Sequence, residues 1–317
     1  MTGMTMPPLR FRPIFHSMLW GGDRLRPFFG LPASPDPVGE AWLLSDVDGN
    51  ESIVAGGPCD GRTLRDLLRS DGEAILGATP RIQGRFPLLL KLIDAKLPLS
   101  VQVHPNDDQA HARRPGQNGK TEAWVVLEAN PATSRMYAGV GEGMTEAMFR
   151  DAMARKALAG ALHSFIPKPH DCVFLNAGTI HAIGAETFLF EVQQTSDITY
   201  RLYDWDRVDA RTGQPRELHL DDGLAVSNFA GPCRPVTPVP DGDAERLVDC
   251  PYFTLTRHRL TTPATWAPTG RLRVAVVIEG RGTIADEQVR PGDTVLLPAA
   301  GGAVAVDGAM TVLECTA

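Results

Sequence analysis

The amino-acid sequence predicts a mainly β protein that consists of tandem jelly rolls with a few short helices. Its 26 prolines and 31 glycines are spread along almost the whole chain. Long helical periodicity is rare, and short apolar or alternating runs lie between turn residues, which is typical of β-sandwiches and barrels. A faint internal repeat indicates that two such sandwiches are related.

The expected strands follow from the short apolar runs. The clearest runs are Leu99–Val103, Ala123–Leu127, Cys172–Leu175, Thr187–Val192, Val274–Ile278 and Thr294–Leu297. Two segments favour helices instead. Thr63 is a suitable N-cap for a short helix through Leu64, Leu67 and Leu68. Apolar residues at nearly helical spacing predict a longer helix from Thr145 to about His163.

The internal repeat relates two turn–strand segments. Pro169–Ala177 aligns with Pro291–Ala299, with proline, aspartate, valine, leucine and alanine at matching positions. Continued without a gap, the alignment sets Ala303 against His181. We therefore expect that one copy has a histidine at this place and the other does not.

A segment rich in proline and glycine, residues 231–243, predicts a linker between domains. We accordingly expect a catalytic jelly roll with small helical insertions at residues 1–235. Residues 244–317 should form a smaller jelly roll without a metal site.

Composition excludes some classes of partner. The net charge is −7 and the pI is about 5.6, so we expect neither nucleic acid nor a membrane surface as a partner, because both favour a basic face. The start of the chain, Met1–Pro8, has no basic stretch followed by an apolar run, so no signal peptide is expected. Five scattered cysteines indicate free thiols in a reducing compartment. We expect a cytoplasmic monomer or homodimer.

The densest group of chemically competent residues lies in the run Leu99–Pro105. Side chains alternate along a strand, so Gln102 and His104 project to one side together with Ser100. Polar groups on an inward face would lack hydrogen bonds unless something binds them. The alternative is an internally satisfied polar pair or a surface turn, which is the commoner origin of a Gln-x-His pattern.

Two further residues extend this group. Glu122 begins the strand Ala123–Leu127, and His181 follows a turn that contains Gly178. Together with Gln102 and His104, they offer the imidazole and oxygen ligands that suit zinc or another borderline divalent metal. Spacing alone does not show that these residues meet.

The third feature is Arg201, which follows an alternating strand and is flanked by aromatic residues. A permanently charged guanidinium suits a phosphate group or a developing enediolate. The alternative is a surface ion pair with an aspartate, of which Asp197, Asp204 and Asp206 are the nearest.

These segments resemble the signature segments of the type I mannose-6-phosphate isomerases, in the same order and at similar distances. The matching segments are Leu99–Pro105, Gly119–Trp124, Gly178–Ala182 and Glu191–Arg201, joined near the start by Trp20–Gly22 and Gly39–Trp42. The resemblance covers about residues 10–230 and is strongest to the short bacterial branch, which lacks a large helical insertion.

The resemblance implies a cupin-type jelly roll that holds one zinc ion and interconverts mannose 6-phosphate and fructose 6-phosphate. The implied zinc ligands are Gln102, His104, Glu122 and His181, and the implied catalytic residues are Arg201 and Lys120. Three residues within the matching segments are assigned to substrate binding: Ser100, Trp20 and Asp197. The partner is thus a small sugar phosphate.

Two departures from the family pattern lie in turns, where His170 and Asn176 replace the usual residues. Two other functions stay open. One is a different metal-dependent cupin enzyme such as an iron dioxygenase, although Gln102 in place of a histidine disfavours it. The other is a non-catalytic cupin that binds a sugar phosphate.

Overall fold

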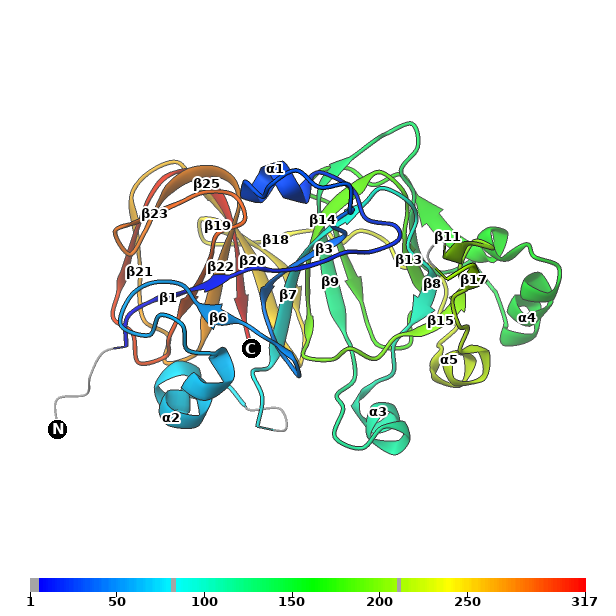
Figure 1. Cartoon of the computed structure of the whole chain (residues 1–317), viewed down its shortest axis with the longest axis horizontal. Helices are drawn as coiled ribbons and strands as arrows, with labels where there is room; N and C mark the ends of the chain where they lie inside the picture. Colours follow the sequence, from blue (N-terminus) through cyan, green and yellow to red (C-terminus); the bar gives the residue numbers. More distant parts are fainter. Residues whose placement is uncertain (1–5, 81–83, 210–211) are drawn as a thin grey trace. The chain divides into compact units, whose positions relative to one another are not determined.

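The computed structural model of the protein describes residues 6–80, 84–209 and 212–317, and these residues are mainly β (Figure 1). Contacts divide the chain into two compact units. Unit 1 comprises Met1–Ile14, Ala41–Lys91 and Thr237–Ala317, and unit 2 comprises Phe15–Glu40 and Leu92–Val236. The predicted mainly β fold with short helices is confirmed. Residues 1–5, on which part of the signal-peptide expectation depends, lie outside the described residues.

Unit 2 contains two antiparallel sheets. The five strands of the first are, in order, β11 (Leu162–Phe165), β10 (Met136–Val140), β13 (His181–Ile183), β8 (Val101–Val103) and β15 (Tyr200–Tyr203). Consecutive neighbours in the second are β12 (Cys172–Leu175), β9 (Glu122–Ala129) and β14 (Thr187–Gln194). The chain passes between the units four times: within β2 (Ile14–His16), within β3 (Glu40–Leu44), within β7 (Leu88–Ala95) and between Val236 and Thr237.

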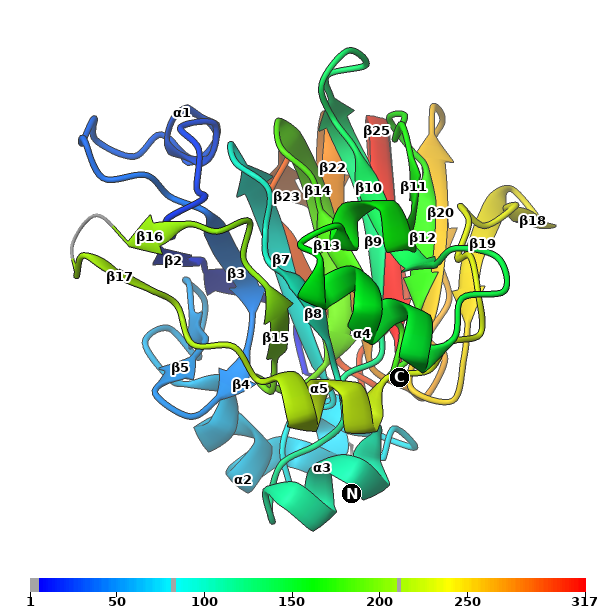
Figure 2. The same ribbon diagram turned by 90° about the vertical axis from the view of Figure 1, so that its right-hand side faces the viewer.

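Alternation along the strands separates two cores in unit 2. Val101 and Val103 of β8 pack on one face of the five-stranded sheet, in an apolar cluster with residues of α4 (Glu146–Ala154) and α5 (Leu220–Val226). Figure 2 shows these two helices over β8, β13 and β15. A second cluster, around Trp124, lies between the two sheets. The opposite face of β8 is therefore free to carry polar side chains inwards.

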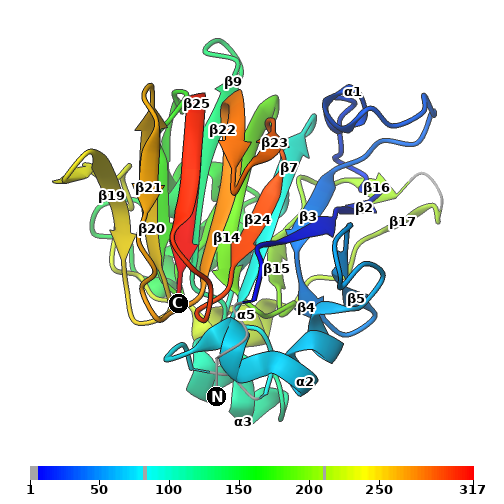
Figure 3. The ribbon, with the colours of Figure 1, turned by 90° about the vertical axis from the view of Figure 1, so that its left-hand side faces the viewer.

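Unit 1 contains a ten-stranded antiparallel sheet, seen face-on in Figure 3. Its main path is β18 (Val239–Asp241), β19 (Ala244–Asp249), β20 (Thr254–Leu260), β25 (Val304–Thr316), β22 (Arg273–Ile284), β24 (Thr294–Leu297), β1 (Leu9–Arg12) and β6 (Ile53–Val54). Off this path, β21 (Ala264–Trp266) pairs with β25, and β23 (Glu287–Val289) pairs with β22. Two small hairpins complete the strands: β4 (Asp46–Val47) with β5 (Asn50–Glu51), and β16 (Val208–Asp209) with β17 (Gln214–Pro215).

The expected strands agree closely with the observed ones. Cys172–Leu175 and Thr294–Leu297 match β12 and β24 at both ends, and the other four expected strands each overlap a real one. Residues 239–241, within the expected linker, instead form β18. Pro240 lies inside this short edge strand, and Gly242 follows it with a φ of 59°.

The helix expected after Thr63 is confirmed as α2 (Leu64–Leu76), and the Thr63 hydroxyl accepts a hydrogen bond from Asp66 N at 3.1 Å. The helix expected over Thr145–His163 is shorter, because α4 ends at Ala154. Lys156 then adopts a φ of 54°, in the left-handed region, which a continuing α-helix cannot contain. A 3-10 turn, η1 (Leu158–Ala161), and strand β11 follow.

Three short helices have no counterpart in the expectations: α1 (Leu25–Phe29), α3 (Asp107–Arg113) and α5 (Leu220–Val226). The α3 helix begins with a capping box, in which Asn106 and Gln109 exchange side-chain and backbone hydrogen bonds. Its first residue also holds the loop to β9, because Asp107 Oδ1 accepts from Gly119 N at 2.8 Å. This capping box is a local signal that apolar periodicity alone does not reveal.

The internal repeat corresponds to two equivalent turns. In the first, Asp171 Oδ2 accepts from Lys168 N at 2.9 Å, and in the second, Asp293 Oδ2 accepts from Arg290 N at 2.9 Å. The residue before each aspartate has positive φ, 72° at His170 and 90° at Gly292. The same backbone turn therefore introduces β12 and β24.

The repeat extends to the neighbouring strands. Leu175 of β12 pairs with Glu122, whereas Leu297, its counterpart in β24, pairs with Arg273. Cross-strand partners share a face of the sheet. Unit 1 therefore has an arginine at the position that Glu122 occupies in unit 2.

Arg273 belongs to a closed polar cluster within unit 1. It forms a bidentate ion pair with Glu314, in which Nε donates to Oε1 at 2.9 Å and Nη2 donates to Oε2 at 2.7 Å. Its guanidinium lies 5.0 Å from the ring centre of Trp266. His258 Nε2 lies 3.2 Å from a Glu314 oxygen. Burial would raise the pKa of Glu314, but hydrogen bonds from His258 and Arg273 outweigh it and lower the pKa to about 2.

This ion pair predicts a stability effect. Arg273→Met leaves the mostly buried Glu314 carboxylate without its main partner and should lower the free energy of unfolding by about 3–5 kcal/mol. The double variant Arg273→Met/Glu314→Leu should recover most of that loss. Urea unfolding measures both, with the exposed Arg69→Met as control. A single variant as stable as the control would contradict the assigned role of the pair.

Candidate metal centre and active site

One row of cross-strand neighbours builds the first side of the site. His181 of β13 pairs with Gln102 of β8, and Gln102 pairs in turn with Arg201 of β15. Residues paired across antiparallel strands point to the same face. These three side chains therefore share the inner face of the five-stranded sheet, and His104 follows at the end of β8.

The second sheet supplies the carboxylates. Glu122 is the first residue of β9 and pairs with Gln193 of β14, while Trp124 pairs with Glu191. The indole nitrogen of Trp124 donates to Glu191 Oε2 at 2.8 Å. The inner face of this sheet thus presents two buried carboxylates beside an indole.

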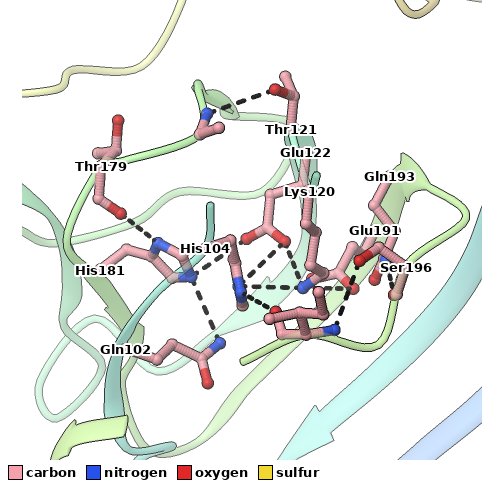
Figure 4. A network of polar contacts seen from close by, with 12 residues as sticks. Gln102, His104, Lys120, Thr121, Glu122, Thr179, His181, Glu191, Gln193 and Ser196 are labelled. Carbon is pink, nitrogen blue, oxygen red and sulfur yellow. Dashed lines mark hydrogen bonds and ion pairs between the residues drawn. The ribbon is translucent and has the colours of Figure 1, made fainter. Parts of the chain in front are cut away.

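The two faces meet at Glu122 (Figure 4). Its Oε1 lies 3.3 Å from His181 Nε2, and its Oε2 lies 3.7 Å from His104 Nε2. Gln102 Nε2 is 3.3 Å from His181 Nε2. Among the described residues, His104, Glu122 and His181 form the only group of metal-competent side chains whose ligand atoms converge, all within 4.8 Å of one another.

Backbone carbonyls orient both imidazoles. His104 Nδ1 lies 2.8 Å from Ile198 O, and His181 Nδ1 lies 2.8 Å from Thr179 O. An Nδ1–H that donates to a carbonyl leaves the Nε2 lone pair available, as in metal-binding histidines generally. Both Nε2 atoms therefore face Glu122 as potential ligands.

The histidine His181 is held neutral. Burial, reinforced by the positive charge of Lys120, lowers its pKa from 6.5 to about 4. A metal ligand must be the unprotonated imidazole. At neutral pH this side chain is therefore already in the form that binds a metal ion.

Lys120 lies next to these residues and not at the surface. Its Nζ is 2.6 Å from Glu122 Oε2, 3.1 Å from His104 Nε2 and 4.0 Å from Glu191 Oε1. Figure 4 shows the ammonium group between the imidazole of His104 and the two carboxylates. A cation in this position compensates the negative charge that the strand pair buries.

Arg201 lies at the edge of the same row. Burial lowers the pKa of Arg201, and the positive charge of Arg216 lowers it further. The guanidinium nevertheless remains charged. Its Nη1 donates to Glu217 O at 2.8 Å, whereas Nε is buried and has no hydrogen-bond partner in the described part of the chain. Asp204 pairs with Arg207 and Arg216, and Asp206 lies 3.9 Å from Lys156 Nζ, so Arg201 keeps donor capacity.

The three residues expected to bind substrate lie in different surroundings. Ser100 is buried just before β8, on the side of the strand that Gln102 occupies by alternation. Asp197 is exposed in the turn between β14 and β15. Trp20 is 4% exposed and packs in the apolar cluster around Trp124.

Sequence reasoning gave no role to several polar residues of the site. Glu191 is one of them, although it alternates with Gln193 on β14 as Lys120 alternates with Glu122, and this spacing was a usable signal.

The polar residues of the turn after β14 also received no role. Gln193 Nε2 donates to Ser196 O at 2.8 Å, and Ser196 Oγ donates to Asn118 O at 2.7 Å. This turn holds the carbonyl that orients His104.

A group of arginines also went unnoticed. Asp204 accepts hydrogen bonds from Arg207 and from Arg216, whose Nε lies 2.8 Å from Oδ2. These bonds outweigh burial and lower the pKa of Asp204. Arg201 lies close enough to feel the charges of Arg207 and Arg216, as well as those of Asp204 and Glu217, so three guanidinium groups gather beside the site.

Comparisons with known proteins agree with this geometry. A family model described as phosphomannose isomerase type I, catalytic domain, matches residues 9–130, and one described as mannose-6-phosphate isomerase, cupin domain, matches residues 243–316. Mannose-6-phosphate isomerase ManA of Bacillus subtilis is 35% identical over 96% of this chain and 97% of its own length. The chain belongs to the type I phosphomannose isomerase family.

Other family members are similar over comparable lengths. Mannose-6-phosphate isomerase of Streptococcus mutans is 33% identical over 92% of each chain. The crystal structure of mannose 6-phosphate isomerase from Bacillus subtilis superposes with a TM-score of 0.89 at 29% identity, covering 98% of this chain and 99% of that one. The resemblance and the cupin-type fold expected from the sequence are therefore confirmed. No helix in the described ranges is long and apolar enough to cross a membrane.

The lowered pKa of His181 predicts a pH effect on the metal-free protein. Between pH 6.5 and about 4 the unfolded chain binds a proton at this histidine that the folded chain does not, so the free energy of unfolding falls as the pH falls. The loss should reach about 3 kcal/mol. Urea unfolding of the chelated protein at pH 7 and pH 4 measures it. The loss in His181→Gln should be smaller by that amount, and equal losses would refute the assignment.

Proposed function

We propose that the chain is a zinc-dependent aldose–ketose isomerase that interconverts mannose 6-phosphate and fructose 6-phosphate through an enediol. The observation that carries this proposal is the convergence of His104, Glu122 and His181 in a buried site of a chain that belongs to this family. The relatives that are 33–35% identical over nearly the full length are named mannose-6-phosphate isomerases.

The donor set favours zinc. Two imidazole nitrogens and one carboxylate are ligands that zinc commonly takes, at about 2.0–2.2 Å. Two ligand atoms at that distance on a tetrahedral ion are roughly 3.4 Å apart, similar to the 3.3 and 3.7 Å between Glu122 and the two imidazoles. Gln102 would be the fourth ligand once its amide is turned so that the oxygen faces His181.

The reaction moves a proton between C1 and C2 of the open-chain sugar, and negative charge grows on the neighbouring oxygens. A bound zinc ion supplies Lewis-acid stabilisation of a substrate oxygen. Lys120 and Arg201 contribute further positive charge, and both are held in place by contacts to buried or backbone groups. Because the site is buried, these charges act where water screens them little.

The substrate is an anion, and the arginine group beside the site suits it. Arg201 Nε and Arg207 Nη1 are buried donors that find no acceptor among the described residues. Buried donors of this kind are stabilised when a ligand oxygen accepts from them. We infer that the phosphate lies near these two arginines, with Ser100 on the same inner face. Asp197 and Trp20 remain predicted substrate-binding residues.

The same proposal assigns no metal to the C-terminal jelly roll, residues 244–317, because Arg273 and Glu314 fill the corresponding position. It also places the enzyme in the cytoplasm. No disulfide joins the five cysteines, all of which lie in the described part of the chain, and a reducing compartment suits such a protein.

Metal content provides the first test. Purified protein should contain about one zinc per chain, and chelation should abolish mannose-6-phosphate isomerase activity until zinc is restored. His181→Ala should lose nearly all bound metal, because the C-terminal jelly roll retains none. A dioxygenase-type cupin would instead contain iron and lack this activity. Protein that stays active with no divalent metal would refute the proposal.

Arg201→Ala tests the catalytic assignment. Loss of a charge that stabilises the transition state should lower kcat by roughly 10²–10³, or about 2.7–4 kcal/mol. Zinc content and Tm should stay near wild type. Lys120→Ala should be similarly impaired, although its contact with Glu122 also puts the metal at risk.

The control for this series must be an arginine outside the site. Arg207 is unsuitable, because it is mostly buried and paired with Asp204. Arg155→Ala is suitable, since its side chain is 67% exposed and forms a surface ion pair with Asp151. A normal kcat in Arg201→Ala, or a loss explained by unfolding, would show that Arg201 has another role.

A further inference from the structure

The strand that carries Arg201 has a covered edge. β15 is the last strand of its sheet, with β8 on one side. A short stretch, Arg216–His219, here called the edge segment, contacts β15 from the other side. Arg216 binds Asp204, Glu217 O accepts from the Arg201 guanidinium, and His219 contacts the Arg201 backbone. The position of Arg201 therefore depends on this segment.

His219 makes the most specific of these contacts. Its Nδ1 accepts from Arg201 N at 3.2 Å, and its own backbone N–H donates to Arg201 O at 2.8 Å. One residue thus satisfies both backbone polar groups of Arg201, which would otherwise lack a partner strand. The first bond requires an imidazole whose Nδ1 carries a lone pair, because a protonated Nδ1 cannot accept.

His219 is itself fixed by the helix that follows it. It is the N-cap residue of α5, and its carbonyl accepts from Gly223 N at 2.8 Å. The helix lies close to β15, since a Cβ on Gly223 would come within 2.6 Å of Leu202 Cδ2. This close approach leaves α5 little freedom to slide along the strand. The imidazole therefore transmits the position of a packed helix to Arg201.

We propose that His219 is a positioning residue for Arg201 in the isomerase reaction. This inference depends on the proposed function, because it assigns to Arg201 a role in the chemical step. His219 does not touch the substrate. It fixes the backbone from which the guanidinium extends, while Glu217 O holds the guanidinium itself. A small displacement of a catalytic group can cost on the order of a hundredfold in rate.

The test compares three substitutions of His219. His219→Leu removes the acceptor and should lower kcat about tenfold or more, with a smaller change in KM. His219→Asn places an amide oxygen, which can accept a hydrogen bond, near the position of Nδ1, and asparagine also suits a helix N-cap. Its kcat should therefore stay within about threefold of the wild-type value. His219→Gln moves the acceptor one bond further out and should be intermediate. Zinc content and Tm serve as folding checks, and His163→Leu, on the distant strand β11, is the matched control.

A double-variant cycle distinguishes positioning from a general structural effect. In the Arg201→Ala background, His219→Leu should cause no further loss of kcat, because its effect acts through the missing guanidinium. Equal activity of the Leu and Asn variants, or additive losses in the double variant, would overturn the inference and leave the proposed function intact. A normal kcat in Arg201→Ala would instead contradict the proposed function. If His219→Leu is unstable, the Asn and Gln variants decide the question.

Discussion

The site depends on the contact between two sheets at Glu122. Its two carboxylate oxygens face the Nε2 atoms of His181 and His104, which come from the opposite sheet. A contact between Nδ1 and a backbone carbonyl orients each imidazole. Such an arrangement needs both sheets in a fixed register, since a shift of one residue would turn every inward side chain outwards. The apolar cluster around Trp124 and the helices over the outer face maintain that register. The scaffold thus serves to hold a few polar atoms together where water has little access.

The two jelly rolls show that the scaffold alone does not determine the chemistry. The equivalent turns at Asp171 and Asp293 introduce equivalent strands. On the neighbouring strand, one copy has Glu122 facing imidazoles and the other has Arg273 paired with a carboxylate. Glu122 faces two imidazole nitrogens, with which it can share a metal ion, whereas Glu314 faces the guanidinium of Arg273, which cannot be a metal ligand. Function therefore follows from residue identity at matched positions of a common fold.

The fold class, most strands and helix α2 could be predicted, because period-two alternation and an N-capping threonine are local signals. The convergence of Gln102, His104, Glu122 and His181 was inferred from family resemblance, since spacing along the chain does not reveal which strands are neighbours. Residues that act through others escaped prediction for the same reason. His219 gains its significance only from contacts across the fold, whereas the alternation of Glu191 with Gln193 was a signal that the sequence did contain. The end of α4 was missed because a left-handed residue interrupts a pattern that remains apolar.

The central claim is that these two sheets hold one metal ion for a sugar-phosphate isomerase. Anomalous X-ray diffraction at the zinc absorption edge, from crystals soaked in fructose 6-phosphate, tests it most directly. The account predicts a single anomalous peak per chain, bounded by the side chains of Gln102, His104, Glu122 and His181, with sugar density between the ion and Arg201. A peak elsewhere in the chain, no peak in active protein, or sugar bound away from the metal would contradict it.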